Sequence, residues 1–270
     1  MRVSVLGSGS SGNAVAIQTE NGTLLIDAGF GFRSLSSRSK KVGVSLSSVR
    51  AILLTHEHGD HSAGVPSLVR KLGCPVYGSS GTLRALARTN GHIRTVEIGT
   101  EAPTNICDLI VNACHTNHDA LEPLALTVQD PATGLKLGLA SDVGCPSQRL
   151  TDLLSGCHCL IVEANHDESM LRHGPYPAPV RHRIAGPNGH LSNRAAAGML
   201  GNLVHEDLDT VVLFHLSRRC NRPDLAHNEV RTALDASGFR GNLLVARQSE
   251  PLQSFQVRSV REQLSFEMYS

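Results

Sequence analysis

The chain has 270 residues, of which 40% are hydrophobic and 18% are charged, and its formal net charge is +1. These values are typical of a globular protein with one large domain or two small ones, and they exclude a disordered chain and a polycation. Aromatic residues make up only 3% and tryptophan is absent, which disfavours a protein that stacks single-stranded bases on aromatic side chains.

The first half of the chain predicts mostly short strands. Apolar runs of strand length predict strands at residues 3–6, 14–19, 24–27, 51–54, 75–77, 93–98, 109–113, 124–128 and 135–140. Helices are predicted over residues 62–72, which Gly73 ends, and over residues 82–89. After Asp27 we expect a region of turns with few helices.

Strands and helices alternate in the second half. Strands are predicted at residues 159–163, 211–214 and 243–246, and helices at 146–154, 193–204 and 223–236. We expect one domain over residues 1–250, followed by a tail, residues 251–270, to which we assign no role. A meander-like first half and an alternating second half predict an α/β protein with two sheets packed face to face and helices outside.

Cysteine usage and hydropathy predict where the protein resides. The seven cysteines are odd in number and form no Cys-x-x-Cys pair, which is typical of reduced thiols. No segment approaches the ~18 apolar residues that a membrane-spanning helix needs, and no secretory signal is recognisable. We therefore expect a cytoplasmic protein without a membrane partner, and we infer no obligate protein partner.

The sequence Thr-His-Glu-His-Gly-Asp-His directly follows the predicted strand 51–54 and carries four metal-competent side chains, His56, His58, Asp60 and His61. Imidazoles and carboxylates are ligands that zinc prefers, and grouping them so densely is costly without a cation between them. The first two histidines lie two apart in an extended segment, so they can hold one ion. Gly59 would let the backbone bend so that the last two ligands face a second ion.

Further ligands are predicted where strongly coordinating residues first follow an apolar strand. His118 follows the strand 109–113, Asp142 follows the strand 135–140, and His215 follows the strand 211–214. Ligands at strand ends can converge at one rim of a fold. His115 competes with His118 for the third position on the first ion, and we favour His118.

These residues resemble the metallo-β-lactamase superfamily. Several stretches resemble its YycJ/WalJ-type branch, namely residues 7–13 (Gly-Ser-Gly-Ser-Ser-Gly-Asn), 118–120 (His-Asp-Ala), 163–167 (Glu-Ala-Asn-His-Asp), 189–193 (Gly-His-Leu-Ser-Asn) and 215–217 (His-Leu-Ser). The resemblance implies an αβ/βα four-layer sandwich with a di-metal site at one edge of the sheets.

The resemblance also implies an assignment of ligands. His56, His58 and His118 would hold the first ion, Asp60, His61 and His215 the second, and Asp142 would bridge them. Asp27, at a strand end, would orient the ligand loop through hydrogen bonds. Zinc is the expected metal, and manganese is an alternative that the mixed ligand set leaves open.

A di-metal hydrolase with these ligands would use a metal-bridging hydroxide to attack a phosphorus or carbonyl centre. We predict Asp60 and His190 as catalytic residues, with His190 protonating the leaving oxygen, and His166 as a second candidate for that proton transfer.

The predicted substrate contacts favour a phosphodiester. Ser10, Ser11 and Asn13 lie in a loop of small residues whose amides could cradle an anion, and Ser192 and Asn193 open a predicted helix next to His166. Two stretches rich in arginine or lysine and free of acids, between residues 27 and 57 and between 168 and 206, could attract phosphates.

The resemblance implies a nuclease, and a DNA exonuclease is the leading hypothesis. The alternative is a hydrolase of small thioesters or lactones. DNA against RNA, and exonucleolytic against endonucleolytic cleavage, stay open.

Overall fold

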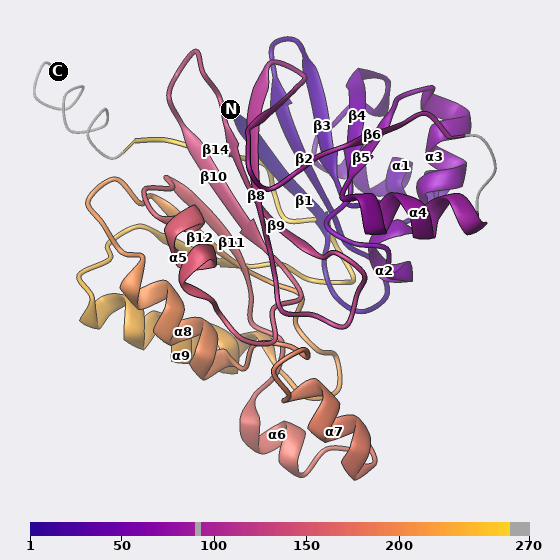
Figure 1. Ribbon diagram of the computed structural model, residues 1–270. Coiled ribbons are helices and arrows are strands. Elements are labelled where there is room, and N and C mark those ends of the chain that lie inside the picture. Colours follow the sequence, from indigo (N-terminus) through magenta and orange to yellow (C-terminus); the bar gives the residue numbers. More distant parts are fainter. Residues whose placement is uncertain (90–92, 260–270) are drawn as a thin grey trace, which may run out of the picture.

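Two sheets packed face to face form the centre of the protein in a computed structural model that describes residues 1–89 and 93–259. Helices α1, α3 and α4 cover one sheet and α5, α8 and α9 the other, while α6 and α7 project from the body (Figure 1). The predicted α/β sandwich of four layers, helix–sheet–sheet–helix, is confirmed.

The first sheet has the strand order β14-β1-β2-β3-β4-β5-β6 within the described residues. Its strands are β1 (Arg2–Gly7), β2 (Ala14–Thr19), β3 (Gly22–Ile26), β4 (Val49–Leu53), β5 (Val76–Gly78), β6 (Thr95–Glu97) and β14 (Phe255–Gln256). β1, β2 and β3 are antiparallel, whereas β3 to β6 run parallel.

The second sheet has the order β13-β12-β11-β10-β9-β8-β7. Its strands are β7 (Thr104–Ile106), β8 (Leu109–His115), β9 (Leu124–Gln129), β10 (Lys136–Ala140), β11 (Cys159–Glu163), β12 (Thr210–Phe214) and β13 (Asn242–Val245). β7 to β10 are antiparallel, and β10 to β13 are parallel.

The helices are α1 (Phe32–Lys41), α2 (Gly59–Ser62), α3 (Val65–Leu72), α4 (Ser80–Thr89), α5 (Gln148–Leu154), α6 (Glu168–Arg172), α7 (Ala178–Ile184), α8 (Asn193–Asn202) and α9 (Pro223–Ala236), and a 3₁₀ turn spans Leu46–Ser48. None of the helices that the structure describes is long and apolar enough to cross a bilayer.

Strand β11 shows why the parallel strands read as unbroken apolar runs. Cys159 and Ile161 pack between the two sheets, whereas Leu160 and Val162 face the helices α8 and α9. Both faces of the strand are therefore buried, as is usual for a parallel sheet covered by helices. The parallel strands of each sheet end at one edge, where the polar residues that follow them come together.

One helical prediction was wrong, and another was correct except at its start. Helix α1 occupies the region of turns expected after Asp27. It was missed because its sequence, Phe-Arg-Ser-Leu-Ser-Ser-Arg-Ser-Lys-Lys, buries only Leu35 and Ser39 and so shows little apolar periodicity. The helix expected over residues 62–72 is present as α3, which begins three residues later, at Val65, and is ended by Gly73 as predicted. Ser62 belongs instead to the short helix α2. Gly64 lies between the two helices, where an added Cβ would clash with the carbonyl oxygen of Phe30.

The segment after residue 250 contributes to the first sheet. β14 pairs with β1, Leu252 N donates to Val5 O at 2.8 Å, and Val257 is buried. The remainder of the segment, residues 260–270, lies outside the described residues.

Gly29 lets the loop after β3 pack against the loop that carries the histidine cluster. A Cβ atom at Gly29 would lie 1.8 Å from the carbonyl oxygen of Asp60, whereas one at Gly59 would meet nothing within 4 Å. Gly59 also lies outside the left-handed region and begins helix α2. The bend that we attributed to Gly59 therefore does not need a glycine, and Gly29 is the residue that the close approach requires.

We expect Gly29→Ala to destabilise the fold by about 1–3 kcal/mol or more, because the clash is with backbone rather than with a flexible side chain. Thermal unfolding followed by circular dichroism should show a fall in Tm of several degrees. Gly59→Ala is the matched control and should leave Tm unchanged or slightly raised. Equal Tm values for the two variants would contradict this account of the packing.

Candidate metal centre

Three residues of the predicted site follow strands in a strained backbone conformation. Asp27, Asp142 and His215 have φ angles of 58°, 58° and 55°, in a left-handed region that residues other than glycine seldom adopt. They follow β3, β10 and β12, at the edge where the parallel strands end. Such strain persists only where the surrounding structure enforces it, and it concentrates at functional sites.

His56, His58 and His118 form the first cluster, with one ring nitrogen of each within 4.8 Å of the others. His118 Nε2 lies 3.3 Å from His58 Nδ1, while His118 Nδ1 donates to Gly189 O at 3.0 Å. His56 Nε2 is buried without a hydrogen-bond partner among the described residues. His115 is exposed at the end of β8 and lies outside this cluster. The choice of His118 over His115 therefore agrees with the geometry.

Asp60, His61 and His215 form the second cluster. Asp60 Oδ2 lies 3.1 Å from His215 Nε2 and 3.5 Å from His61 Nε2. Helix α2 carries the first two of these residues, and the start of the loop after β12 carries the third. Each imidazole thus directs Nε2 at the same carboxylate.

Asp142 lies between the two clusters. Its Oδ2 is 3.1 Å from His61 Nε2, and its Oδ1 is 3.7 Å from His118 Nε2. Its side chain is only 3% exposed. One carboxylate therefore faces ligands of both clusters, which is the arrangement that a bridging residue needs.

The electrostatics of the site favour a positive charge. Burial lowers the pKa of His56 well below its usual value. Burial also acts to lower the pKa of His61, but the carboxylates of Asp27 and Asp142 outweigh it and raise that pKa well above the usual value. The pKa of His215 is raised to about 10 against its burial, mainly by Asp142. A divalent cation would displace these protons and supply the same charge, so the residues fit a bound metal.

Asp27 and Asn13 hold the ligands in place. Asp27 Oδ2 accepts from His61 Nδ1 at 2.7 Å, and its carboxylate also accepts from the amide and hydroxyl of Thr55. This pairing fixes the imidazole with Nε2 toward Asp60 and Asp142, which is the orienting role predicted for Asp27. The side-chain amide of Asn13 donates to the backbone and side-chain oxygens of Asp60 and lies 3.0 Å from His61 Nε2. Asn13 therefore orients ligands, whereas we expected it to contact substrate.

Glu163 is a central residue that sequence reasoning did not assign. It is fully buried, and its Oε1 lies 2.7 Å from His190 Nδ1 and 3.1 Å from His215 Nδ1. Its Oε2 accepts from the amides of Val143 and Leu191. Burial alone would raise its pKa, but the adjacent imidazoles, His190 foremost, lower it to about 2. The sequence did contain a signal for Glu163, because it is an acid directly at the end of an apolar strand, which is the kind of position at which the other ligands were predicted.

The glycine-rich loop, residues 7–13, offers fewer free amides than expected. Most of its amides donate to acceptors within the protein: Ser8 N to Arg247 O, Gly9 N to Asn13 Oδ1, Ser11 N to Gln248 Oε1, Gly12 N to Gly9 O and Asn13 N to Asp60 O. An anion cradle built from these amides is therefore not supported. The side chains of Ser10 and Ser11 are exposed, and their contact with substrate stays a prediction.

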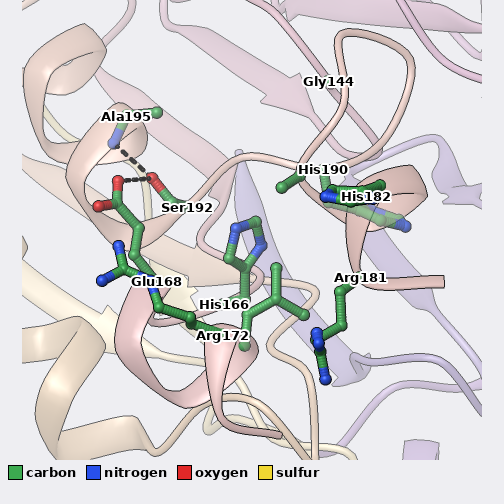
Figure 2. Close-up of a pocket in the computed structure, with 11 residues that line it drawn as sticks. Gly144, His166, Glu168, Arg172, Arg181, His182, His190, Ser192 and Ala195 are labelled. Atoms are coloured by element: carbon green, nitrogen blue, oxygen red, sulfur yellow. Dashed lines mark hydrogen bonds between the residues drawn. The ribbon is translucent and has the colours of Figure 1, made fainter. Parts of the chain in front are cut away.

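The three substrate residues predicted near helix α8 differ in what they can do. Asn193 is fully buried, and both ends of its side-chain amide pair with Asn221, so a substrate role for Asn193 is not supported. Ser192 caps α8, as predicted, by accepting from Ala195 N. His166 and Ser192 both line a pocket beside His190 (Figure 2).

Comparisons with known proteins agree with this geometry. Residues 23–216 match the model of the beta-lactamase superfamily domain. The chain is 33% identical over 242 residues to the exodeoxyribonuclease YycJ of Bacillus anthracis, covering 88% of this chain and 91% of that protein. It is 30% identical over 233 residues to the exodeoxyribonuclease WalJ of Streptococcus pneumoniae, covering 84% of this chain and 85% of that protein.

The metallo-beta-lactamase fold protein YhfI from Bacillus subtilis superposes with a TM-score of 0.70 at 17% identity, over 93% of this chain and 99% of that chain. The match of the family model to residues 23–216 and the 33% identity to YycJ place the chain in the metallo-β-lactamase superfamily. Within the superfamily it is a member of the YycJ/WalJ branch, as the motifs predicted. The fold and the two clusters together define a divalent-metal-binding site.

Metal binding should stabilise the protein in a pH-dependent way. Zinc at about a hundred times its Kd should stabilise the fold by ~2.7 kcal/mol, which corresponds to a rise in Tm of about 5–10 °C. In the metal-free protein, obtained with a chelator, the pKa of His215 is raised to about 10. The protonated imidazole therefore stabilises the folded state, and this contribution is fully present below pH ~6.5. That contribution is lost as the pH rises through the folded-state value.

Differential scanning calorimetry from pH 6.5 to 10, with chelator and with zinc, measures both effects. We expect the Tm of the metal-free protein to fall as the pH rises. The increase in Tm that zinc binding causes should become larger over the same range. A rise in the Tm of the metal-free protein over this pH range would contradict the charge balance described for the site.

Proposed function

We propose that this protein is a metal-dependent nuclease that cleaves phosphodiester bonds of DNA from a strand end. The observation that carries the proposal is that two clusters of three metal-competent side chains meet at Asp142. The two relatives reported above, which match most of the chain, are both named exodeoxyribonucleases.

In this proposal His56, His58 and His118 would hold one divalent ion, Asp60, His61 and His215 would hold a second, and Asp142 would lie between them. Two such ions, when bound, would supply an activated water and neutralise charge that develops on the phosphate. Imidazole-rich sets favour zinc, and the carboxylates also suit manganese. We propose zinc as the resident metal, which metal analysis of the purified protein would test.

His190 is suited to hold a proton for the leaving oxygen. Its Nδ1 faces Glu163 Oε1 at 2.7 Å, so Nε2 on the other side of the ring is free to carry a second proton. Burial lowers the pKa of His190, but Glu163 and Asp142 outweigh it and raise that pKa above the usual value. The pKa of His166 is instead lowered by burial, which makes His166 the weaker donor at neutral pH.

Asp60 is suited to act on the attacking water. Its side chain is 21% exposed, against 3% for Asp142 and 0% for Glu163. Among these three carboxylates it is therefore the one that a substrate or water can reach most directly.

We also propose that the protein acts in the cytoplasm. The seven cysteines are free thiols, which suits a reducing compartment.

Incubation of metal-loaded protein with end-labelled linear DNA, circular DNA, RNA and a thioester tests the function. We expect linear DNA to be degraded and circular DNA to resist. Asp142→Ala should reduce the rate by about a thousandfold or more, because charge on the phosphate is no longer neutralised. Asp152→Ala, which removes an exposed carboxylate of α5, is the control. Turnover of the thioester with no degradation of nucleic acid would establish the small-molecule alternative instead.

The role of His190 predicts an effect that depends on the leaving group. His190→Ala should lower the rate on DNA by about 10²–10⁴-fold. On an activated aryl phosphodiester, whose leaving group needs no proton, the loss should be much smaller. Steady-state kinetics on both substrates gives the comparison, and an equal loss on both would exclude His190 as the proton donor.

A further inference from the structure

A second pocket, of about 560 Å³, lies at the edge of the sheets that also carries the metal centre, and it shares no lining residue with the pocket beside His190. Its walls are formed by residues that follow β1, β12 and β13, together with Arg38 of α1. Ser8 lies in the wall, and its Oγ accepts from the backbone amide of His215 at 2.7 Å. The pocket therefore borders the second cluster of metal-competent side chains. We call it the Arg218 pocket, after an arginine that lines it.

The glycine-rich loop, residues 7–13, packs against one side of the Arg218 pocket. Gln248, in the pocket wall, accepts from Ser11 N at 2.8 Å and donates to Gly12 O at 2.9 Å. Gly9 has a φ of 136°, and a Cβ there would lie 2.9 Å from Gln248 Oε1. The loop after β1 and the segment after β13 therefore form one connected wall.

Three arginines line the Arg218 pocket, and none of its lining residues is an acid. Arg38 donates through Nη1 to Leu6 O at 3.0 Å and through Nη2 to Gln248 O at 2.9 Å. Both acceptors are neutral, and no carboxylate among residues 1–89 and 93–259 pairs with this guanidinium. Burial accordingly lowers the pKa of Arg38 below its ordinary value. A partly buried charge without a counter-ion is unfavourable, and an anion in the pocket would offset that cost.

The other two arginines, Arg218 and Arg247, carry the positive charge toward solvent, and both are exposed. The Arg218 guanidinium has no ion-pair or hydrogen-bond partner in the described part of the chain. Arg247 Nη1 lies 3.7 Å from Glu250 Oε1, but both of these side chains are more than half exposed. Because an ion pair between exposed side chains contributes little stability, Arg247 can exchange this partner for a phosphate. Two guanidinium groups are thus available to an anion.

The position of the Arg218 pocket favours a polyanion over a single small anion. Arg38 belongs to the basic, acid-free stretch between residues 27 and 57. The second such stretch, between residues 168 and 206, supplies arginines to the pocket beside His190 instead. The two stretches therefore place positive charge at two separate borders of one metal centre. A nucleic-acid strand carries a charge at every linkage, so it can contact both places while one of its bonds lies at the metal centre.

We propose that the Arg218 pocket binds an internal phosphate of the DNA strand whose end is cleaved, and that Arg218 and Arg247 contact this phosphate. Guanidinium groups suit phosphate oxygens because they form paired, charge-assisted hydrogen bonds. The fixed charge of Arg38 in the wall favours the same ligand. The inference rests on the proposed nuclease function and adds a contact that holds the strand at a linkage other than the one being cleaved.

Neutral linkages placed at defined positions in the DNA test the proposal. A methylphosphonate replaces one charged phosphodiester at a time in the strand that the wild-type protein degrades, and the bond that is cleaved first stays unmodified. The measurement is kcat/KM for release of the first nucleotide. For the wild type we expect kcat/KM to fall by about tenfold when the neutral linkage occupies the position that the pocket contacts, because a charge-assisted hydrogen bond is lost.

Arg218→Ala should lower kcat/KM on unmodified DNA by a similar factor, and the neutral linkage at that position should then cause little further loss. Arg247→Ala should show the same pattern with a smaller loss, because Glu250 already engages Arg247. Arg218→Lys keeps the charge and should restore part of the rate. The slope of log kcat/KM against log salt concentration should be shallower by about one in Arg218→Ala.

Arg240→Ala is the matched control, because Arg240 is an exposed arginine just before β13, at the opposite edge of the parallel strands. Its rates, its salt dependence and its response to each neutral linkage should equal those of the wild type. Tm values verify that each variant folds, which we expect because the replaced side chains are exposed.

The failure of this proposal differs from the failure of the proposed function. A wild type that no internal neutral linkage affects, or a linkage effect that survives unchanged in both alanine variants of the pocket, would overturn the pocket assignment and leave the nuclease function standing. Degradation of none of the DNA substrates would overturn the nuclease function, and the pocket assignment with it.

Discussion

The structure depends on burying several imidazoles and carboxylates together at one edge of two sheets. Such groups lose their hydration on burial and are tolerated only when they neutralise one another or bind a cation. In this protein the acids hold His61 and His215 in the charged form against burial. The same charges that stabilise those protons make the edge a site for divalent metal. The same buried charges therefore determine both how this edge of the fold is stabilised and how it binds metal.

The strands supply the precision that this requirement demands. Strained residues follow β3, β10 and β12 and turn their side chains toward the shared edge. A second layer of contacts then fixes each imidazole: Asp27 holds His61, and Glu163 holds both His190 and His215. In each of these three imidazoles the acid engages Nδ1 and leaves Nε2 to face a metal or to carry a proton. The rigid sheets thus set both the ligands and the groups that orient them.

Sequence predicted the fold and the metal-competent residues well because both follow from local patterns. Ligands such as His215 stand at the end of apolar runs, and the resemblance to a known superfamily linked those that lie far apart in the chain. Contacts between residues that lie far apart in the chain were harder to predict from the sequence. Asn13 was read as a substrate contact because its partner, Asp60, lies 47 residues away. Glu163 was not assigned because a buried acid at a strand end does not reveal which histidines it pairs with.

We propose that two ions bind on either side of Asp142, and a crystal structure of the metal-loaded protein with anomalous diffraction measured at the zinc edge tests this placement most directly. We expect two anomalous peaks about 3.5–4 Å apart, as in known two-metal sites, each within bonding distance of the Asp142 carboxylate. A single peak, or peaks that do not contact this residue, would contradict the account.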